Sequence, residues 1–98
     1  MTDIHYPENL ITMLQAVWGE GFLSPGGERE VARIIGGHDL TGASVLDIGC
    51  GAAGIDIALV ARHGAGFVTG IDVEDMVLDH ARALIARAGL TACIGLLM

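Results

Sequence analysis

A glycine-rich turn between an apolar strand and a helix constrains the fold of this chain more than any other feature. Residues 44–48 are short and apolar, Gly49, Gly51 and Gly54 follow them, and residues 55–63 have the pattern of a helix. Glycines let the backbone of such a turn approach a ligand closely, and the helix start presents free N–H groups. We therefore expect a ligand at this turn; the alternative is a tight turn that binds nothing.

The rest of the chain alternates between helix and strand patterns. Residues 7–18 and 28–35 predict two N-terminal helices, because their apolar residues recur at helical spacing. A second strand is expected at residues 66–71, then a helix that Asp75 caps and Gly89 ends, then a third strand within residues 91–98. This order predicts a parallel sheet with right-handed crossovers.

The expected fold is therefore α/β. It is a Rossmann-like parallel sheet with the strand order 3-2-1, two N-terminal helices, and helices on both faces of the sheet. We expect residues 1–98 to form one domain, with N-terminal helices and a loop in residues 1–40 and the Rossmann-like part in residues 44–98. Helical spacing assigns these residues to the core: Leu10, Ile11, Leu14, Val17, Trp18, Val31, Ile34, Ile35, Val77, Ala81, Leu84, Ile85 and Ala88.

Charge and cysteine usage narrow the classes of partner. The net charge is −7, and all five basic residues are arginine, so neither nucleic acid nor an anionic membrane is an expected partner. Cys50 and Cys93 are far apart and belong to no metal-binding pattern, which favours reduced thiols in a cytoplasmic protein. No signal peptide or membrane span is expected, and the histidines share no metal-ligand spacing.

Two acidic residues near the turn separate the candidate ligands. Asp72 follows the second strand, where a carboxylate can accept hydrogen bonds from ribose hydroxyls, and with the three glycines it matches a dinucleotide fingerprint. Asp47 lies just before Gly49, where it would repel a pyrophosphate. It would attract a ligand with a sulfonium and an ammonium group, which is S-adenosylmethionine. A small NAD-binding domain is the alternative.

These residues also resemble a known family. Leu46-Asp47-Ile48-Gly49-Cys50-Gly51 is similar to the first motif of the seven-strand S-adenosylmethionine-dependent methyltransferases, and Gly70-Ile71-Asp72 is similar to their second motif. The segment from Trp18 to Gly27 resembles the phosphoethanolamine N-methyltransferase-like branch. The resemblance covers residues from about 6 to 90 and corresponds to the cofactor-binding half of such an enzyme. It therefore implies a truncated Rossmann-like fold, with a lid loop within residues 1–40 and the Rossmann-like half in residues 44–98.

The resemblance implies roles for individual residues. Tyr6 would lie over the active site in a lid helix, and it is the one acceptor-side, catalytic candidate. Ala53 stands where the family usually has glycine, and its methyl group is expected to crowd the approach to the cofactor. The residues implied to hold S-adenosylmethionine are Leu23, Ser24, Asp47, Gly49, Cys50, Gly51, Asp72 and Val73. The Cys50 thiol is expected to pack rather than to react.

The function expected from the resemblance is methyl transfer from S-adenosylmethionine to a small amine or phosphobase. A binding or assembly module that keeps the cofactor pocket without catalysis is an alternative. The strand at residues 45–48 has no neighbour in the sequence for its outer edge, and 52% of the residues are hydrophobic. We therefore expect a homodimer or larger assembly through this edge or through residues 91–98.

Overall fold

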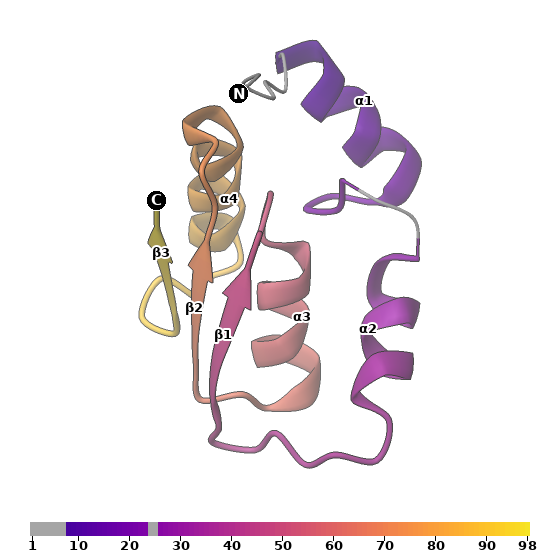
Figure 1. Cartoon of the computed structure of the whole chain (residues 1–98), viewed down its shortest axis with the longest axis vertical. Helices are drawn as coiled ribbons and strands as arrows, with labels where there is room; N and C mark the ends of the chain where they lie inside the picture. The colour runs from indigo at the N-terminus through magenta and orange to yellow at the C-terminus, as the bar shows by residue number, and fades with distance from the viewer. Residues whose placement is uncertain (1–7, 24–25) are drawn as a thin grey trace.

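The computed structural model describes residues 8–23 and 26–98. These residues form four helices and three strands, which Figure 1 shows with the strands running in one direction. No helix in these two ranges is long and apolar enough to cross a bilayer. The elements are α1 (Glu8–Trp18), α2 (Gly27–Ile35), β1 (Ser44–Ile48), α3 (Gly54–His63), β2 (Phe67–Ile71), α4 (Asp75–Arg87) and β3 (Ile94–Leu97).

The sheet confirms the predicted α/β topology. All strand pairs are parallel, and the order β1-β2-β3 is the expected 3-2-1 order counted from the other edge. In the register, Asp47 lies beside Gly70 and Val68 lies beside Ile94. β3 confirms the expected third strand. The carboxyl ends of the strands therefore meet at one end of the sheet, where the glycine turn lies.

Helices among the described residues cover one face of the sheet, so the expectation of helices on both faces is wrong. Val68 and Ile94 belong to one buried cluster with residues of both α3 and α4. Two right-handed crossovers that advance in the same direction place both helices on the same face. The opposite face presents large apolar side chains to solvent: Leu46, Ile48, Phe67 and Leu97.

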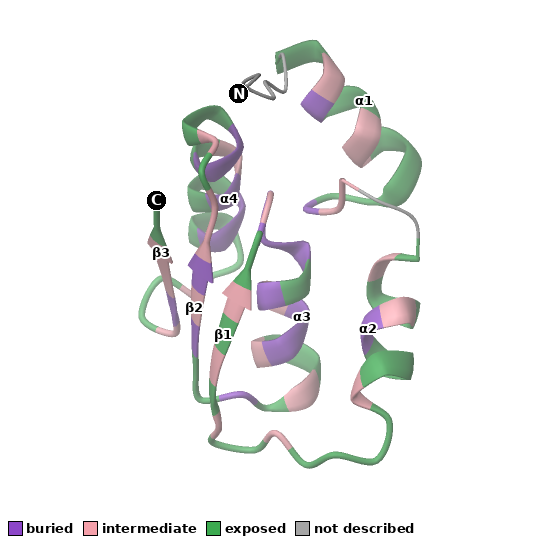
Figure 2. Cartoon of the chain, viewed as in Figure 1, coloured by how far each residue is buried: buried purple, intermediate pink, exposed green. Residues whose placement is uncertain are grey.

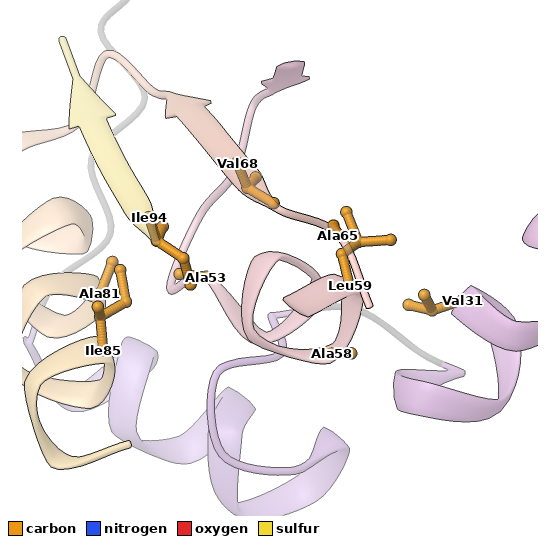
Figure 3. Packing of buried hydrophobic residues seen from close by; sticks show 9 residues of the cluster. All are labelled: Val31, Ala53, Ala58, Leu59, Ala65, Val68, Ala81, Ile85 and Ile94. Atoms are coloured by element: carbon orange, nitrogen blue, oxygen red, sulfur yellow. The ribbon is translucent and has the colours of Figure 1, made fainter. Parts of the chain in front are cut away.

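The core lies between this covered face and the helices. Figure 3 shows Val31 of α2 at one end of the cluster and Ala81 and Ile85 of α4 at the other, with α3 between them. Ala53 is completely buried in the same cluster. Its methyl group therefore contacts the core and does not crowd the open side of the turn, contrary to expectation.

The outer helices bury narrower stripes than their periodicity predicts. Ile11 of α1 and Val31 of α2 are buried, whereas Val17 and Ile34 are exposed on the same helices. Figure 2 shows that each of these two helices has a short buried segment and is otherwise exposed or half-buried. Trp18 of α1 and Ala88, which caps the C-terminus of α4, are also exposed. α2 packs mainly on α3, and a helix with one neighbour covers only part of its apolar face.

β1 and the start of α4 also differ from expectation. Exposed and half-buried residues alternate along β1, because it lies at the sheet edge with one face open; it is not a buried strand. α4 begins at Asp75, and Glu74 occupies the N-cap position, so Asp75 is not the cap. Gly64 caps the C-terminus of α3 in the left-handed backbone conformation, as the sequence predicted when it placed the end of this helix at Gly64.

Candidate cofactor site at the glycine turn

The turn between β1 and α3 is held open by backbone conformation. Gly49 and Gly51 have φ angles of 79° and 56°, in the left-handed region that favours glycine. The N–H groups of Gly49 and Cys50 donate to the carbonyl oxygen of Ile71, at 2.6 and 3.0 Å, which joins the turn to the end of β2. A Cβ atom at Gly49 would meet no described residue within 4 Å, so the described part of the chain leaves this side of the turn open.

Asp72 meets the turn directly after β2. Its Oδ2 atom accepts a hydrogen bond from the Gly51 N–H at 3.0 Å, and its Oδ1 atom accepts one from the Glu74 N–H at 3.1 Å. The backbone N–H of Asp72 donates to the carbonyl oxygen of Leu97 at 3.1 Å. These bonds fix the carboxylate, and each of its oxygens keeps a second lone pair for a hydroxyl donor.

The loop after α1 packs against the same turn. The Gly54 N–H donates to the carbonyl oxygen of Gly21 at 2.8 Å, and the Gly21 N–H donates to Gln15 Oε1 at 2.7 Å. A Cβ atom at Gly51 would lie 3.3 Å from Leu23 Cδ1. The structure therefore brings Leu23 to the turn, as the resemblance implies. Tyr6 and Ser24 lie outside the described residues.

Asp47 has a buried acidic neighbour that sequence reasoning missed. Asp56, in the first turn of α3, has no exposed surface, and its two carboxyl oxygens and Asp47 Oδ2 are buried with no hydrogen-bond donor among the described residues. Burial, the hydrogen bond that a protonated Asp56 donates to Asp47, and the negative charge of Asp47 raise the pKa of Asp56 to about 9. The one signal in the sequence was Asp56 itself, because it is a charged residue within an otherwise apolar run.

The remaining predicted site residues differ in exposure. Cys50 is buried, and burial followed by the charges of Asp56, Asp72 and Asp47 raises its pKa to about 12. Its thiol is therefore protonated and packs in the turn, as expected. Val73 is 88% exposed beside Asp72, so its side chain contacts solvent at the mouth of the site.

Carboxyl groups dominate the electrostatics of the turn. Asp47, Asp56 and Asp72 all lie close enough to Cys50 to affect its pKa. Such an arrangement favours a cationic ligand group and disfavours a phosphate. The described residues contain no cluster of three or more histidine, cysteine or acidic side chains that would hold a metal ion.

Comparison with known proteins finds one family in this region. A family profile described as a methyltransferase domain matches residues 45–96, which contain β1, the glycine turn and both crossover units. The match therefore includes Asp47, the turn glycines and Asp72.

Two relatives extend this result. The chain is 53% identical over 49 residues to the ubiquinone biosynthesis O-methyltransferase of Neisseria meningitidis serogroup C (strain 053442), covering 49% of this chain and 20% of that protein. It is 33% identical over 89 residues to phosphoethanolamine N-methyltransferase 3 of Arabidopsis thaliana, covering 86% of this chain and 18% of that protein. The chain thus spans about a fifth of the length of these relatives.

A solved structure has the same arrangement of elements. Phosphoethanolamine N-methyltransferase 2 of Haemonchus contortus superposes with a TM-score of 0.79 and 26% sequence identity, covering 93% of this chain and 21% of that one. That crystal structure is a complex with phosphomonomethylethanolamine and S-adenosylhomocysteine. The similarity identifies the truncated Rossmann-like fold.

Proposed function

Because the chain belongs to the methyltransferase domain family, we propose that it binds S-adenosylmethionine at the turn between β1 and α3 and serves methyl transfer to a small amine or phosphobase. The observation that carries this proposal is the hydrogen bond from the Gly51 N–H to Asp72 Oδ2. It places a fixed carboxylate beside a glycine turn that is open at Gly49.

The chemistry of the residues around the turn fits this cofactor. Asp47 is half-buried and would face the ammonium group of the methionine part, since a carboxylate binds a cation most strongly where water is partly excluded. Asp72 would accept hydrogen bonds from the ribose hydroxyls. Gly49 and Gly51 leave room for close approach, and Leu23, Ser24, Cys50 and Val73 complete the predicted set.

The reacting group would come from the cofactor. When bound, S-adenosylmethionine supplies an electrophilic methyl group on its sulfonium. The residues of this chain would bind and orient it: Asp47 attracts positive charge, and Leu23, which lies against Gly51, would shield that part of the turn from water. Such alignment is the main contribution that a protein makes to an in-line displacement.

The acceptor proposal rests on the relatives that cover most of the chain. The Arabidopsis and Haemonchus proteins are named as phosphoethanolamine N-methyltransferases, and the Haemonchus structure contains a phosphobase. We therefore assign a small amine or phosphobase as the acceptor class. Tyr6 remains the proposed acceptor-side residue.

The charge distribution supports a small-molecule acceptor in the cytoplasm rather than a nucleic acid. Four arginines lie within 4.0 Å of acidic side chains, so they do not form a free basic surface. These arginines are Arg33, Arg62, Arg82 and Arg87.

The thiols support the cytoplasm as the compartment. Cys50 and Cys93 are free, which fits a reducing environment.

The experiment that tests cofactor binding is the substitution Asp47→Asn. The variant should bind S-adenosylmethionine about tenfold to a hundredfold more weakly, because the ammonium group loses its charged partner while the side chain keeps its size. Titration calorimetry of the unaltered chain and the variant measures the difference.

Asp39→Asn is the matched control. Asp39 is an exposed acid before the amino end of β1, and its carboxylate accepts a hydrogen bond from the Thr41 N–H. This variant should bind as the unaltered chain does. Binding of NAD in place of S-adenosylmethionine, or equal affinity of Asp47→Asn and the unaltered chain, would contradict the proposal.

We further propose that two copies associate through β1. Within the described residues β1 pairs only with β2, so its outer backbone edge is free. Leu46 is 59% and Ile48 is 78% exposed on the adjoining open face. An edge strand beside an apolar face favours pairing with another chain, and a second copy of β1 would give both edges a partner.

Light scattering after size exclusion should give the mass of a dimer or larger assembly for the unaltered chain. Ile48→Lys should shift the chain toward the monomer, because two lysines would be brought together at the interface. Ile34→Lys is the control, since Ile34 is 71% exposed on α2 and lies outside the sheet. A monomeric unaltered chain across micromolar concentrations would overturn the proposal.

A further inference from the structure

Asp56 forms an acidic pair with Asp47 next to the glycine turn, and Asp56 itself has no role in the contacts proposed so far. Asp56 is completely buried, and Asp47 lies on β1, the edge strand of the same site. Three oxygens of the pair, Asp47 Oδ2 and both of Asp56, are buried without a donor in the described part of the chain. Two carboxylates in such contact repel each other, and the arrangement is satisfied when they hold one proton between them.

The strand next to the pair makes space for it. Gly70 lies beside Asp47 in the sheet register, and a Cβ atom at Gly70 would lie 2.5 Å from Asp56 Oδ2. The same Cβ atom would lie 2.9 Å from the Cβ and Sγ atoms of Cys50. The acidic side chain thus occupies the space that a side chain on β2 would otherwise fill.

The other titratable groups around the pair give Asp56 no opposite charge. Cys50 lies on the turn, and burial and the neighbouring acids keep its thiol protonated by raising its pKa to about 12. Asp72 follows β2 and directs its oxygens to the N–H groups of Gly51 and Glu74. Asp47 is the charged group that acts on Asp56 through both hydrogen bonding and repulsion.

We infer that Asp56 is a positioning residue of the cofactor site, which shares one proton with Asp47 and thereby holds the Asp47 carboxylate toward the ligand. The inference rests on the proposed binding of S-adenosylmethionine. It explains why an acid occupies a core position. A buried carboxyl without a hydrogen-bond donor lowers the stability of the fold, and the site gains affinity for the cofactor in exchange.

Two substitutions of Asp56 separate positioning from packing. Asp56→Asn keeps the size and offers Asp47 an N–H donor, so its affinity for S-adenosylmethionine should stay close to that of the unaltered chain. Asp56→Leu fills the space but offers no donor, so its affinity should fall at least about tenfold. Titration calorimetry at neutral pH measures both.

Thermal unfolding without ligand gives an independent readout. The unfolded chain releases the Asp56 proton at the ordinary pKa of about 3.9, whereas the folded chain keeps it up to about 9, so stability falls as pH rises between these values. Neither variant carries this proton. Their Tm values should therefore rise relative to that of the unaltered chain as the pH is raised through this window.

The outcomes distinguish this inference from the proposed function. If the unaltered chain and Asp56→Leu bind S-adenosylmethionine equally well, the positioning role is overturned while the proposed function stands. If the differences in Tm do not change with pH, the shared proton is overturned. If the unaltered chain does not bind S-adenosylmethionine, the proposed function is overturned, and the role of Asp56 toward this ligand with it.

Discussion

Gly70→Val should lower the free energy of unfolding by about 3 kcal/mol, a large part of the stability of a small domain. Gly70 is buried in β2, the middle strand. A side chain there would meet Asp56 Oδ2 at 2.5 Å and the Cβ and Sγ atoms of Cys50 at 2.9 Å. Both neighbours are buried, so neither can move away without disturbing the contacts between α3 and the sheet.

Urea unfolding followed by circular dichroism measures this loss. Gly37→Val is the control, because a Cβ atom at Gly37 would meet nothing within 4 Å. The smaller change Gly70→Ala should regain part of its lost stability when it is combined with Asp56→Ala, which removes one of the two obstructing groups. Equal stability of Gly70→Val and Gly37→Val would show that β2 tolerates a side chain here.

Gly54→Val should detach the loop after α1 from the glycine turn, with a loss of about 2–3 kcal/mol in the free energy of unfolding and a loss of cofactor binding. A Cβ atom at Gly54 would lie 2.6 Å from the carbonyl oxygen of Gly21 and 2.8 Å from Phe22 Cε2. The nearest atom belongs to the backbone, so only movement of the whole loop relieves the overlap. That movement breaks the hydrogen bond from the Gly54 N–H to Gly21.

Limited digestion with chymotrypsin measures the detachment. This protease cleaves after aromatic residues, and Trp18 ends α1 while Phe22 lies in the loop that follows. Cleavage of Gly54→Val should be at least about tenfold faster, since proteolysis follows the population of the opened state. Ile55→Val is the matched control: it places valine at the next, exposed position in the same turn of α3. Equal cleavage rates for the two variants would contradict the proposed packing of the loop.

Local sequence patterns predicted the elements and their order. A short apolar run followed by glycines indicated β1 and its turn, and helical periodicity indicated α4. The alternation of strand and helix then predicted parallel neighbours, because a parallel pair requires a crossover. The residual errors lie at element ends, as at Asp75, where one residue separates the cap from the first helical position.

Part of the candidate site also follows from the sequence. Parallel strands bring their carboxyl ends to one edge, so Asp72 after β2 and the glycines after β1 were expected to meet there, and the structure joins Asp72 to Gly51. Asp56 was not expected. Its burial depends on the missing side chain of Gly70, which lies beside it only once β1 and β2 have paired.

The sequence by itself therefore determined the α/β class, the strand order and the position of the glycine turn. Strand and helix patterns are local, and parallel neighbours follow from the alternation of strand and helix. Tertiary structure decided which apolar residues are buried. Ile11 is buried while Val17 and Ile34 are exposed, because each outer helix has few neighbours to cover it. Periodicity within a segment carries no information about its neighbours. The single covered face of the sheet follows instead from the strand order, because two right-handed crossovers that advance in the same direction place both helices on one face.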